Sequence, residues 1–373
     1  MKIRTIAIYL PQFHPTQEND EWWGKGFTEW TNVVKAKPLF KGHYQPHLPT
    51  DLGFYDLRVP EVREAQAQLA KEYGIYGFCY YHYWFNGKRI IERPFREILE
   101  SGTPDFPFML CWANENWTKT WSGGDNDILL EQKYSHEDDR EHIQYLLKIF
   151  KDNRYIKIDN KPVIAIYRST KLPEVVETLK IWRQEAKKMG MELYICRFES
   201  FGEAGSELLD DSGFDAAIEF QPNGQLRKQF QKKIHSKFIN RVFNKFYQTL
   251  PNFIKRYFYL PNKYGDILDY QKYVNYSLQQ PAKNYKIFPT VTPMWDNSAR
   301  KKKDYVIFKN STPEIYENWI KKILKRYKPY SKEENLFFIN AWNEWAEGNH
   351  LEPCAKWGKK YLEATKRAFE INK

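Results

Sequence analysis

The chain has little cysteine, and its cysteines form no pattern typical of a disulfide or metal site. The four cysteines among 373 residues are scattered, with no Cys-x-x-Cys pair. Three of them lie in or beside apolar runs, so we expect reduced residues of the core. No His-Glu-x-x-His sequence or other close grouping of ligands occurs. We therefore expect neither a metal nor a cofactor.

A long hydrophobic run is also missing. No stretch of 18 apolar residues is present, and a short apolar run begins directly after Met1 and Lys2. This start lacks the hydrophobic segment and small-residue cleavage site of a signal peptide. We therefore expect a protein of the cytoplasm.

Phosphate-binding loops are absent as well. Neither Gly-x-Gly-x-x-Gly nor a Walker-type sequence follows an apolar run, which argues against a doubly wound dinucleotide-binding sheet. The triplet 125–127, Asp-Asn-Asp, resembles the Asp-x-Asp of many nucleotide-sugar-dependent enzymes. Without a Rossmann-type pattern around it, we interpret this triplet as a solvated turn.

What the chain does contain is a regular alternation of strands and helices. Eight short apolar runs cover residues 3–10, 75–80, 106–112, 163–167, 193–196, 214–220, 287–291 and 336–341. Amphipathic segments separate most of them, among them 59–73, 136–152, 172–189 and 312–327. Apolar strands alternating with helices predict a parallel sheet covered by helices. Eight such units predict a single (β/α)8 TIM barrel over residues 1–373, with a long loop after its first strand.

The segment 340–348, Asn-Ala-Trp-Asn-Glu-Trp-Ala-Glu-Gly, follows the last apolar run. It places Glu344 and Glu347 three residues apart among tryptophans. Paired carboxylates suit cleavage of a glycosidic bond, because one exchanges a proton with the leaving oxygen while a second group supports the sugar carbon. Aromatic residues make up 17% of the chain, and their flat faces suit sugar rings. The motif predicts a catalytic pair in a glycan site.

Polar or aromatic side chains follow every predicted strand. Because the catalytic groups of a parallel barrel gather at the carboxyl ends of its strands, we expect a ring of substrate-binding residues there. The candidates, taken from the strand ends and the long first loop, are His14, Trp30, His82, Trp84, Asn114, Glu115, Trp117, Tyr167, Glu219, Trp295, Asp296, Asn343 and Trp345. Two of them have a structural alternative: His82 as a core histidine and Glu115 as an internal hydrogen-bond acceptor.

Acidic residues are missing from 221–265, which holds ten lysines and arginines. The formal net charge of the whole chain is +11, so this segment supplies most of the excess. Its apolar residues recur every four positions: Phe230, Ile234, Phe238, Val242, Phe246 and Leu250. The pattern predicts a basic amphipathic insertion between the sixth and seventh strands. Through 226–258 it suits an anionic membrane surface or a lipid-linked glycan. The alternative is a barrel helix with its lysines in water. Without a recognition motif, no nucleic acid is expected.

Several long motifs resemble the WbsX-type family, which is also described as having a glycoside hydrolase family 99-like domain. They lie at 26–32 (Gly-Phe-Thr-Glu-Trp-Thr-Asn), 42–56, 80–85 (Tyr-Tyr-His-Tyr-Trp-Phe), 112–117 (Trp-Ala-Asn-Glu-Asn-Trp) and 340–348. The resemblance covers nearly the whole chain. It implies a (β/α)8 barrel that acts on glycans.

The related hydrolases are retaining endo-α-mannosidases and endo-α-mannanases with an Asn-Glu-Trp-x-Glu-Gly motif. By this resemblance, Glu347 is the general acid/base at the leaving oxygen. Glu344 then takes the proton of the sugar 2-hydroxyl, so that O2 attacks the anomeric carbon and forms a 1,2-anhydro intermediate. Mannose specificity is not implied. Because WbsX-type proteins are commonly named glycosyltransferases, synthesis of a surface polysaccharide is the alternative, and a non-catalytic glycan-binding barrel is a third.

Overall fold

Parallel strands form a nearly closed barrel in the computed structural model, which describes residues 2–119, 124–199, 213–234, 249, 251 and 265–370. The strands of the barrel are β1 (Arg4–Tyr9), β2 (Gly77–His82), β5 (Phe108–Trp112), β9 (Lys161–Ile166), β10 (Tyr194–Glu199), β11 (Ala216–Glu219), β13 (Ile287–Phe288), β14 (Thr290–Val291) and β16 (Leu336–Ile339). Each predicted apolar run therefore forms a strand. β5 and β10 are buried along their whole length, as expected for strands covered on both faces.

The seventh predicted strand is divided at Pro289 into β13 and β14. β13 pairs with β11, whereas β14 pairs with β16, which in turn pairs with β1. Pro289 cannot donate to the ladder, but its carbonyl accepts a hydrogen bond from the backbone N–H of Phe338 at 2.9 Å. The two halves of one strand thus join opposite ends of the sheet, and the predicted barrel is confirmed.

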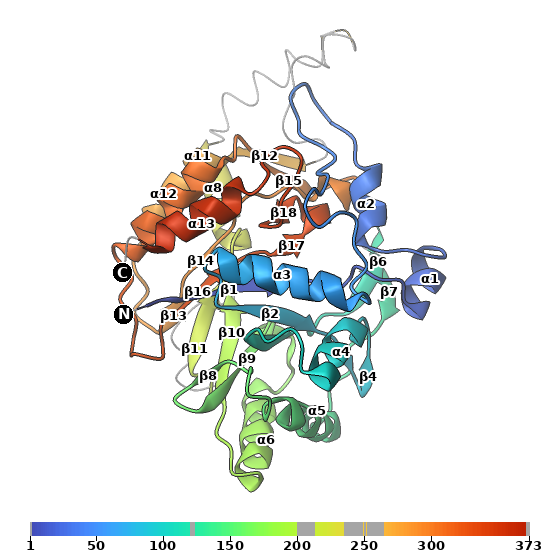
Figure 1. Ribbon diagram of the computed structural model, residues 1–373, viewed down its shortest axis with the longest axis vertical. Helices are drawn as coiled ribbons and strands as arrows, with labels where there is room; N and C mark the ends of the chain where they lie inside the picture. Colours follow the sequence, from blue (N-terminus) through green and yellow to red (C-terminus); the bar gives the residue numbers. More distant parts are fainter. Residues whose placement is uncertain are drawn as a thin grey trace.

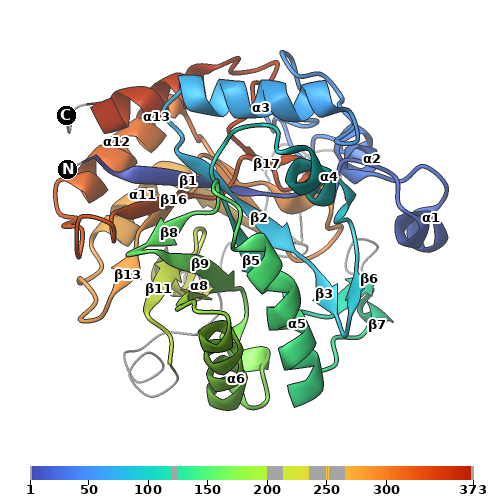
Figure 2. The ribbon, with the colours of Figure 1, turned by 60° about the horizontal axis from the view of Figure 1, so that its bottom comes forward.

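Helices surround the strands. They are α3 (Pro60–Glu72), α4 (Arg93–Ser101), α5 (His136–Ile149), α6 (Val175–Lys188), α8 (Gly224–Ile234), α11 (Tyr270–Leu278), α12 (Pro313–Leu324) and α13 (Lys360–Glu370). Figure 2 shows α3 and α13 on one side of the strands and α5 and α6 on the opposite side. Their starts carry ordinary caps: Ser135 accepts from the N–H of Asp138, and Thr312 precedes a proline in the first turn of α12.

Short elements at one end of the barrel extend it. They include α1 (Gln17–Trp23), α2 (Glu29–Lys35) and the strand pairs β3 (Trp84–Phe85) with β4 (Lys88–Arg89), β6 (Trp117–Lys119) with β7 (Gly124–Leu130) and β17 (Asn343–Glu344) with β18 (Asn349–His350). Figure 1 shows α1, α2, β6 and β7 at the same end. The interpretation of residues 125–127 as a turn was wrong, because they lie in β7.

Two further pairs complete the strands: β8 (Lys157–Ile158) lies antiparallel to β9, and β12 (Gly265–Asp269) is parallel to β15 (Tyr305–Lys309). All four cysteines are buried and free, as expected. Among the residues that the structure describes, no helix is long and apolar enough to cross a membrane.

The predicted basic insertion lies only partly within the described residues. Its first part forms α8, where Phe230 is buried and packs against the rings of Tyr273 and Tyr276 in α11. Lys232 and Lys233 are exposed on the same helix. This part is thus a barrel helix with its lysines in water. The predicted stripe from Phe238 to Leu250, and Lys237, lie outside the described residues.

Candidate active site

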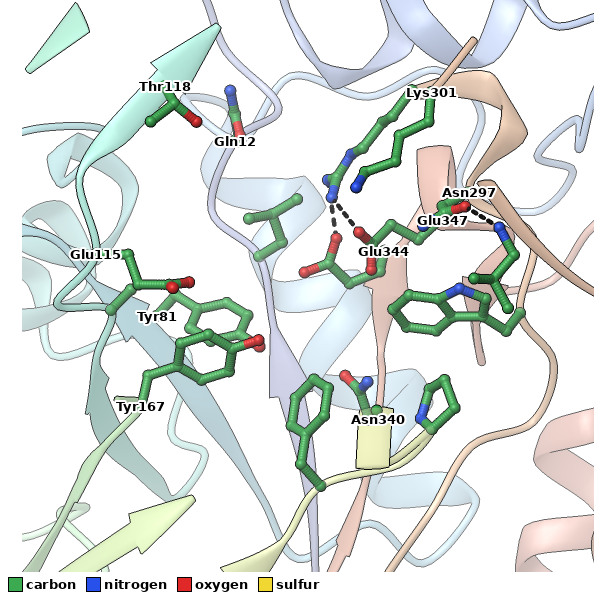
Figure 3. Close-up of a pocket in the computed structure, with 18 of the residues that line it drawn as sticks. Gln12, Tyr81, Glu115, Thr118, Tyr167, Asn297, Lys301, Asn340, Glu344 and Glu347 are labelled. Atoms are coloured by element: carbon green, nitrogen blue, oxygen red, sulfur yellow. Dashed lines mark hydrogen bonds and ion pairs between the residues drawn. The ribbon is translucent and has the colours of Figure 1, made fainter. Parts of the chain in front are cut away.

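A cavity of about 400 Å³ lies at the carboxyl ends of the barrel strands. Several of its lining residues directly follow strands, among them Leu10 after β1, Ala113 after β5 and Asn340 after β16. Figure 3 shows Glu344 and Glu347 on one wall and Tyr81 and Tyr167 on another. The barrel therefore places both acids of the 340–348 motif where a parallel barrel carries its active site.

One arginine holds the acidic wall together. Arg300 places its Nε 2.9 Å from Oε1 of Glu29, its Nη2 2.9 Å from Oε2 of Glu344 and its Nη1 2.8 Å from Oε1 of Glu347. Dashed lines in Figure 3 mark its contacts with Glu344 and Glu347. The guanidinium has a rigid fork of N–H donors, so it fixes the two acids of the motif relative to each other.

Backbone contacts fix Glu347 from the other side. Glu347 ends the short helix η4 (Trp345–Glu347), and its carbonyl accepts a hydrogen bond of 2.6 Å from the N–H of Asp296. Gly348 follows with a φ of +53°, and a Cβ there would lie 2.9 Å from the Cβ of Asp296. A side chain at this position would push the loops after β14 and β16 apart. The final glycine of the motif therefore permits their close approach.

Burial sets the protonation of the acidic wall. The pKa of Glu344 is raised to about 8, first by burial; Arg300 opposes the shift, while Glu347 and Glu29 add to it. Burial likewise raises the pKa of Glu29. Burial and repulsion between neighbouring carboxylates both disfavour the ionised form. Near neutral pH, Glu344 therefore holds a proton, which is typical of a group that takes part in proton transfer.

The opposite wall carries aromatic side chains. Tyr81 and Tyr167 meet edge to face with their ring centres 5.9 Å apart, and Trp117 and Trp295 also line the cavity. Burial raises the pKa of both tyrosines well above its ordinary value, so each phenol keeps its proton and can donate to a hydroxyl. Rings with polar ends on one side and acids on the other form a cavity suited to a sugar.

Six of the residues predicted for the site line the cavity: Glu115, Trp117, Tyr167, Trp295, Glu344 and Glu347. Oε1 of Glu115 also forms an ion pair of 2.7 Å with Nη1 of Arg168. Glu115 is thus both an internal acceptor, which was the structural alternative, and a residue of the cavity wall. The other nine predicted residues do not belong to the lining.

Two of these nine, Asn114 and Asn343, connect strand ends. The Asn343 amide accepts from the N–H of Leu10 at 2.8 Å and donates to the carbonyl of Leu10 at 3.0 Å. Asn114 contacts the backbone N–H and carbonyl of Arg168 in the same way, at 2.8 and 2.9 Å. Each side-chain amide therefore makes the two hydrogen bonds that a further backbone residue of the neighbouring strand would make. It does so at the point where the two strands begin to separate. Both asparagines therefore have a structural role, and substrate binding by them stays a prediction.

The predicted histidines and three tryptophans are buried among other side chains. His82 faces His142 at 3.0 Å, and burial lowers the pKa of His82 to about 3 and that of His14 to about 4. The indole N–H groups are bound internally: Trp30 donates to the carbonyl of Tyr55, Trp84 to Asp138 and Trp345 to Glu352. His82 thus fits the core interpretation that its neighbouring tyrosines left open.

The two remaining acids also have internal partners. Asp296 accepts from Nε2 of His43 at 2.6 Å and from Nε2 of Gln45 at 2.8 Å, which ties the long first loop to the loop after β14. Burial raises the pKa of Asp296, but His43 and Ser298 outweigh that effect and lower it. Glu219 accepts from Nε2 of Gln221 at 2.8 Å, and burial raises its pKa to about 7.

Several lining residues and one acid behind them were not among the predicted site residues. Arg300 and Glu29 complete the acidic wall, while Gln12, Tyr83, Lys301 and Asn340 line the cavity. Arg300 begins a run of four basic residues after the seventh strand, and Glu29 lies inside the 26–32 motif. Both signals were present, but nothing in the sequence joins two residues separated by 271 positions.

Comparisons with known proteins agree with this geometry. The sequence profile of the family described as "Glycosyltransferase WbsX" matches residues 5–365. Proteins named WxcX from two strains of Xanthomonas campestris pv. campestris are 39% and 38% identical over 366 residues. That alignment covers 98% of this chain but 49% of the relatives, so the chain spans about half the length of the curated relatives it matches.

Solved structures share the fold at low sequence identity. A glycoside hydrolase-like protein has a TM-score of 0.59 at 14% identity, with 99% of this chain and 94% of that chain covered. A GH99 endo-α-mannosidase from Bacteroides thetaiotaomicron has a TM-score of 0.54 at 13% identity, with 99% and 97% covered. The same enzyme in complex with bis-tris propane gives 0.53 at 12%, with the same coverage.

The family match covers nearly all of the chain, and the barrel carries its acidic cavity at the carboxyl ends of the strands. The chain is a member of the WbsX glycosyltransferase family.

Proposed function

We propose that the protein is a retaining, endo-acting glycosidase or transglycosidase that uses Glu344 and Glu347. The observation that carries the proposal is the shared guanidinium of Arg300, which holds both acids side by side at the cavity. Two carboxyl groups on one short segment, rather than on opposite walls, suit a reaction in which each handles a different proton. A (β/α)8 barrel with aromatic rings across the cavity supplies the surface for the sugar.

In the first step, Glu347 donates its proton to the leaving oxygen while Glu344 takes the proton of the 2-hydroxyl. O2 attacks the anomeric carbon as the bond to the leaving oxygen breaks, which gives a 1,2-anhydro sugar. In the second step, water or a sugar hydroxyl attacks that carbon, Glu347 takes the proton of the attacking group and Glu344 returns its proton to O2. Two inversions give net retention, and both acids recover their starting state.

The electrostatics support this division of roles. A carboxylate whose pKa is near 8 is a stronger base than an ordinary glutamate, so it suits removal of a hydroxyl proton. Glu347 is the more accessible of the two, with 21% of its side chain exposed against 8% for Glu344. The accessible acid is the one that must meet leaving groups and water.

Product analysis tests the proposal. The protein is incubated with a panel of defined oligosaccharides and lipid-linked glycans in isotope-labelled water, and the products are followed by mass spectrometry and NMR. Hydrolysis places the label at a new reducing end, whereas transfer gives an unlabelled longer product. In both cases the first product keeps the anomeric configuration. Products of inverted configuration would contradict the proposal.

Transfer from a nucleotide sugar is the second candidate, because the matching family is named for glycosyltransferases. It would place the protein in the synthesis of a surface polysaccharide. A thermal-shift panel separates the two: we expect oligosaccharides to raise the melting temperature and nucleotide sugars to leave it unchanged. A clear shift with a nucleotide sugar would favour the second candidate instead.

Contact with an anionic membrane through 226–258 stays a prediction. Lys232 and Lys233 are exposed on α8, which is compatible with such contact. We expect tighter binding to vesicles of anionic lipid than to neutral vesicles, and loss of this difference when Lys232, Lys233 and Lys237 are changed to glutamate. Equal binding to both vesicle types would exclude the contact.

A further inference from the structure

Two buried amide side chains of the cavity wall carry a polar atom that no described residue satisfies. Gln12 follows β1 and Asn340 follows β16, and each is 1% exposed. Figure 3 shows both beside the cavity. Nε2 of Gln12 and Oδ1 of Asn340 have no hydrogen-bond partner among the described residues. An unsatisfied buried donor or acceptor destabilises the fold, and a ligand with the complementary groups would remove that cost.

The Asn340 amide has a fixed orientation. Its Nδ2 donates to the carbonyl of Gln221 at 2.8 Å, so its Oδ1 is left as the acceptor. Gln221 is itself anchored, because its Oε1 accepts from the hydroxyl of Tyr273 at 2.7 Å and its Nε2 donates to Glu219 at 2.8 Å. Through this chain of contacts the predicted residue Glu219 supports Gln221, which in turn orients Asn340. It also means that Asn340 offers an acceptor without reorganisation.

We propose that Gln12 and Asn340 bind the uncharged hydroxyl groups of the sugar ring on which Glu344 and Glu347 act. Asn340 Oδ1 accepts the O–H of one hydroxyl, and Gln12 Nε2 donates to the oxygen of another. This assignment rests on the proposed function, and it adds the class of sugar: a neutral ring with free hydroxyls at both amides. A ring alkylated or acylated at the hydroxyl that faces Asn340 has no hydrogen to donate.

The charges around the cavity favour a neutral ring over an anionic one. Each arginine at the site already has a carboxylate partner: Arg168 pairs with Glu115, Arg227 with Asp266, and Arg300 with the acidic wall. Lys301 is the other cation among the described lining residues, and Asp304 lines the same cavity. A uronate carboxylate would therefore meet acids and the acceptor of Asn340, with one lysine to compensate.

The experiment compares simple probes by saturation-transfer NMR on the full chain. The probes are the methyl glycosides of mannose, glucose, galactose and glucuronic acid. Gln12→Met removes the donor at nearly constant volume, and Asn340→Leu removes the acceptor. The matched control is Asn19→Leu, because Asn19 in α1 is also 1% exposed with an unsatisfied Nδ2 but does not line the cavity.

We expect at least one neutral hexoside to bind the unmodified protein, and the glucuronide to bind at least about fivefold more weakly. Gln12→Met should weaken the neutral probe about tenfold, as expected for loss of a buried hydrogen bond. It should also keep or raise the melting temperature, since it removes an unsatisfied donor. Asn19→Leu should keep both the melting temperature and the affinity for the probe. Loss of affinity without loss of stability distinguishes ligand binding from a structural role.

Three results would overturn the inference: equal or stronger binding of the glucuronide, undiminished probe affinity in folded Gln12→Met, or failure of every neutral probe to bind. Asn340→Leu also breaks the contact with Gln221, so its affinity is compared only if its melting temperature stays within a few degrees. If the melting temperature of Asn340→Leu falls further, the test rests on Gln12→Met alone.

The proposed function fails in a different way. If Gln12→Met loses the probe while Glu347→Gln keeps its turnover, the sugar site stands and the catalytic assignment falls. If Glu347→Gln loses turnover while Gln12→Met keeps its KM, the catalytic assignment stands and this inference falls.

Discussion

Two buried glutamates, only eight residues apart in the chain, have very different surroundings. Glu352 accepts from the hydroxyl of Tyr55 at 2.8 Å, from Nε2 of Gln66 at 2.6 Å and from Nε1 of Trp345 at 2.6 Å. Glu344 instead shares one guanidinium with two other carboxylates and borders the cavity. Burial raises the pKa of both, to about 7 for Glu352 and about 8 for Glu344.

The comparison teaches that a raised pKa alone does not identify a catalytic acid. Neutral donors surround Glu352, so its role is to join the long first loop, α3 and η4. Glu344 has an open side and a charged partner, so it can exchange a proton with a bound sugar. Substitution of Glu344 should therefore lower turnover, whereas substitution of Glu352 should lower stability.

The largest expected effect is on turnover. Glu347→Gln and Glu344→Gln should each lower kcat by about a hundredfold to ten-thousandfold, because each removes a group that transfers a proton. Circular dichroism and the melting temperature should stay close to those of the unmodified protein, since Gln keeps the volume of the side chain. Steady-state kinetics on the glycan found by product analysis measures the effect. If either variant kept its kcat, the catalytic role assigned to that glutamate would be wrong.

The second effect is on stability. Glu352→Gln replaces one accepting oxygen with an NH₂ group that faces donors, so at least one buried donor loses its partner. We expect the free energy of unfolding to fall by about 1–3 kcal/mol, whereas Glu344→Gln, which removes a buried carboxyl group with a raised pKa, should not lower it. Urea denaturation measures both. Equal losses at the two positions would show that Glu344 is as structural as Glu352.

The third effect concerns the pH dependence of turnover. If Glu344 acts as the base, kcat/KM should rise with pH along a limb whose midpoint lies near pH 8, because Glu344 must first lose its proton. Arg300 lowers the pKa of Glu344, so Arg300→Gln should move this limb to higher pH. Arg300→Lys, which keeps the charge, should move it less. A limb unchanged in Arg300→Gln would show that Glu344 does not set the profile.

The smallest effect is on stability as a function of pH. A carboxyl group whose pKa is higher in the folded than in the unfolded state favours folding while it holds its proton. That contribution is present below the unfolded pKa of about 4.3, and is lost as the pH rises through the folded value of about 8 for Glu344 and about 7 for Glu352. These two groups therefore contribute a loss of stability from about pH 5 to pH 8, and Glu344→Gln should lose less stability over this range than the unmodified protein. An identical slope in thermal melts of both proteins would contradict the raised pKa.

The sequence predicted the barrel because each of its strands is a short, nearly continuous apolar run. It also located Glu344 and Glu347, because both lie in one motif after the last strand. It could not predict Arg300 as their partner, since that contact depends on how the loop after β14 meets η4 in the closed barrel. Pro289 gave no clear sign that the two halves of the seventh strand pair with different neighbours.

Amides at strand ends were the hardest residues to interpret. Asn114 and Asn343 were expected to bind substrate, but their side chains pair with backbone groups of neighbouring strand ends. Asn340 was not among the predicted site residues, yet its Oδ1 borders the cavity without a partner among the described residues. The same side chain can complete a ladder or face a ligand. Only the direction of the strand end, which the sequence does not contain, decides between them.

Chemical rescue tests the central claim most directly. An aryl glycoside with a nitrophenol leaving group, made from the sugar that product analysis identifies, is given to Glu347→Ala with and without azide. Because this leaving group needs no proton, the intermediate forms and waits for a nucleophile. We predict that azide restores turnover in Glu347→Ala and gives a glycosyl azide of retained configuration, while Glu352→Ala gives none. Absence of a glycosyl azide, or full activity of Glu347→Ala without azide, would contradict the assignment of Glu347 as the general acid/base.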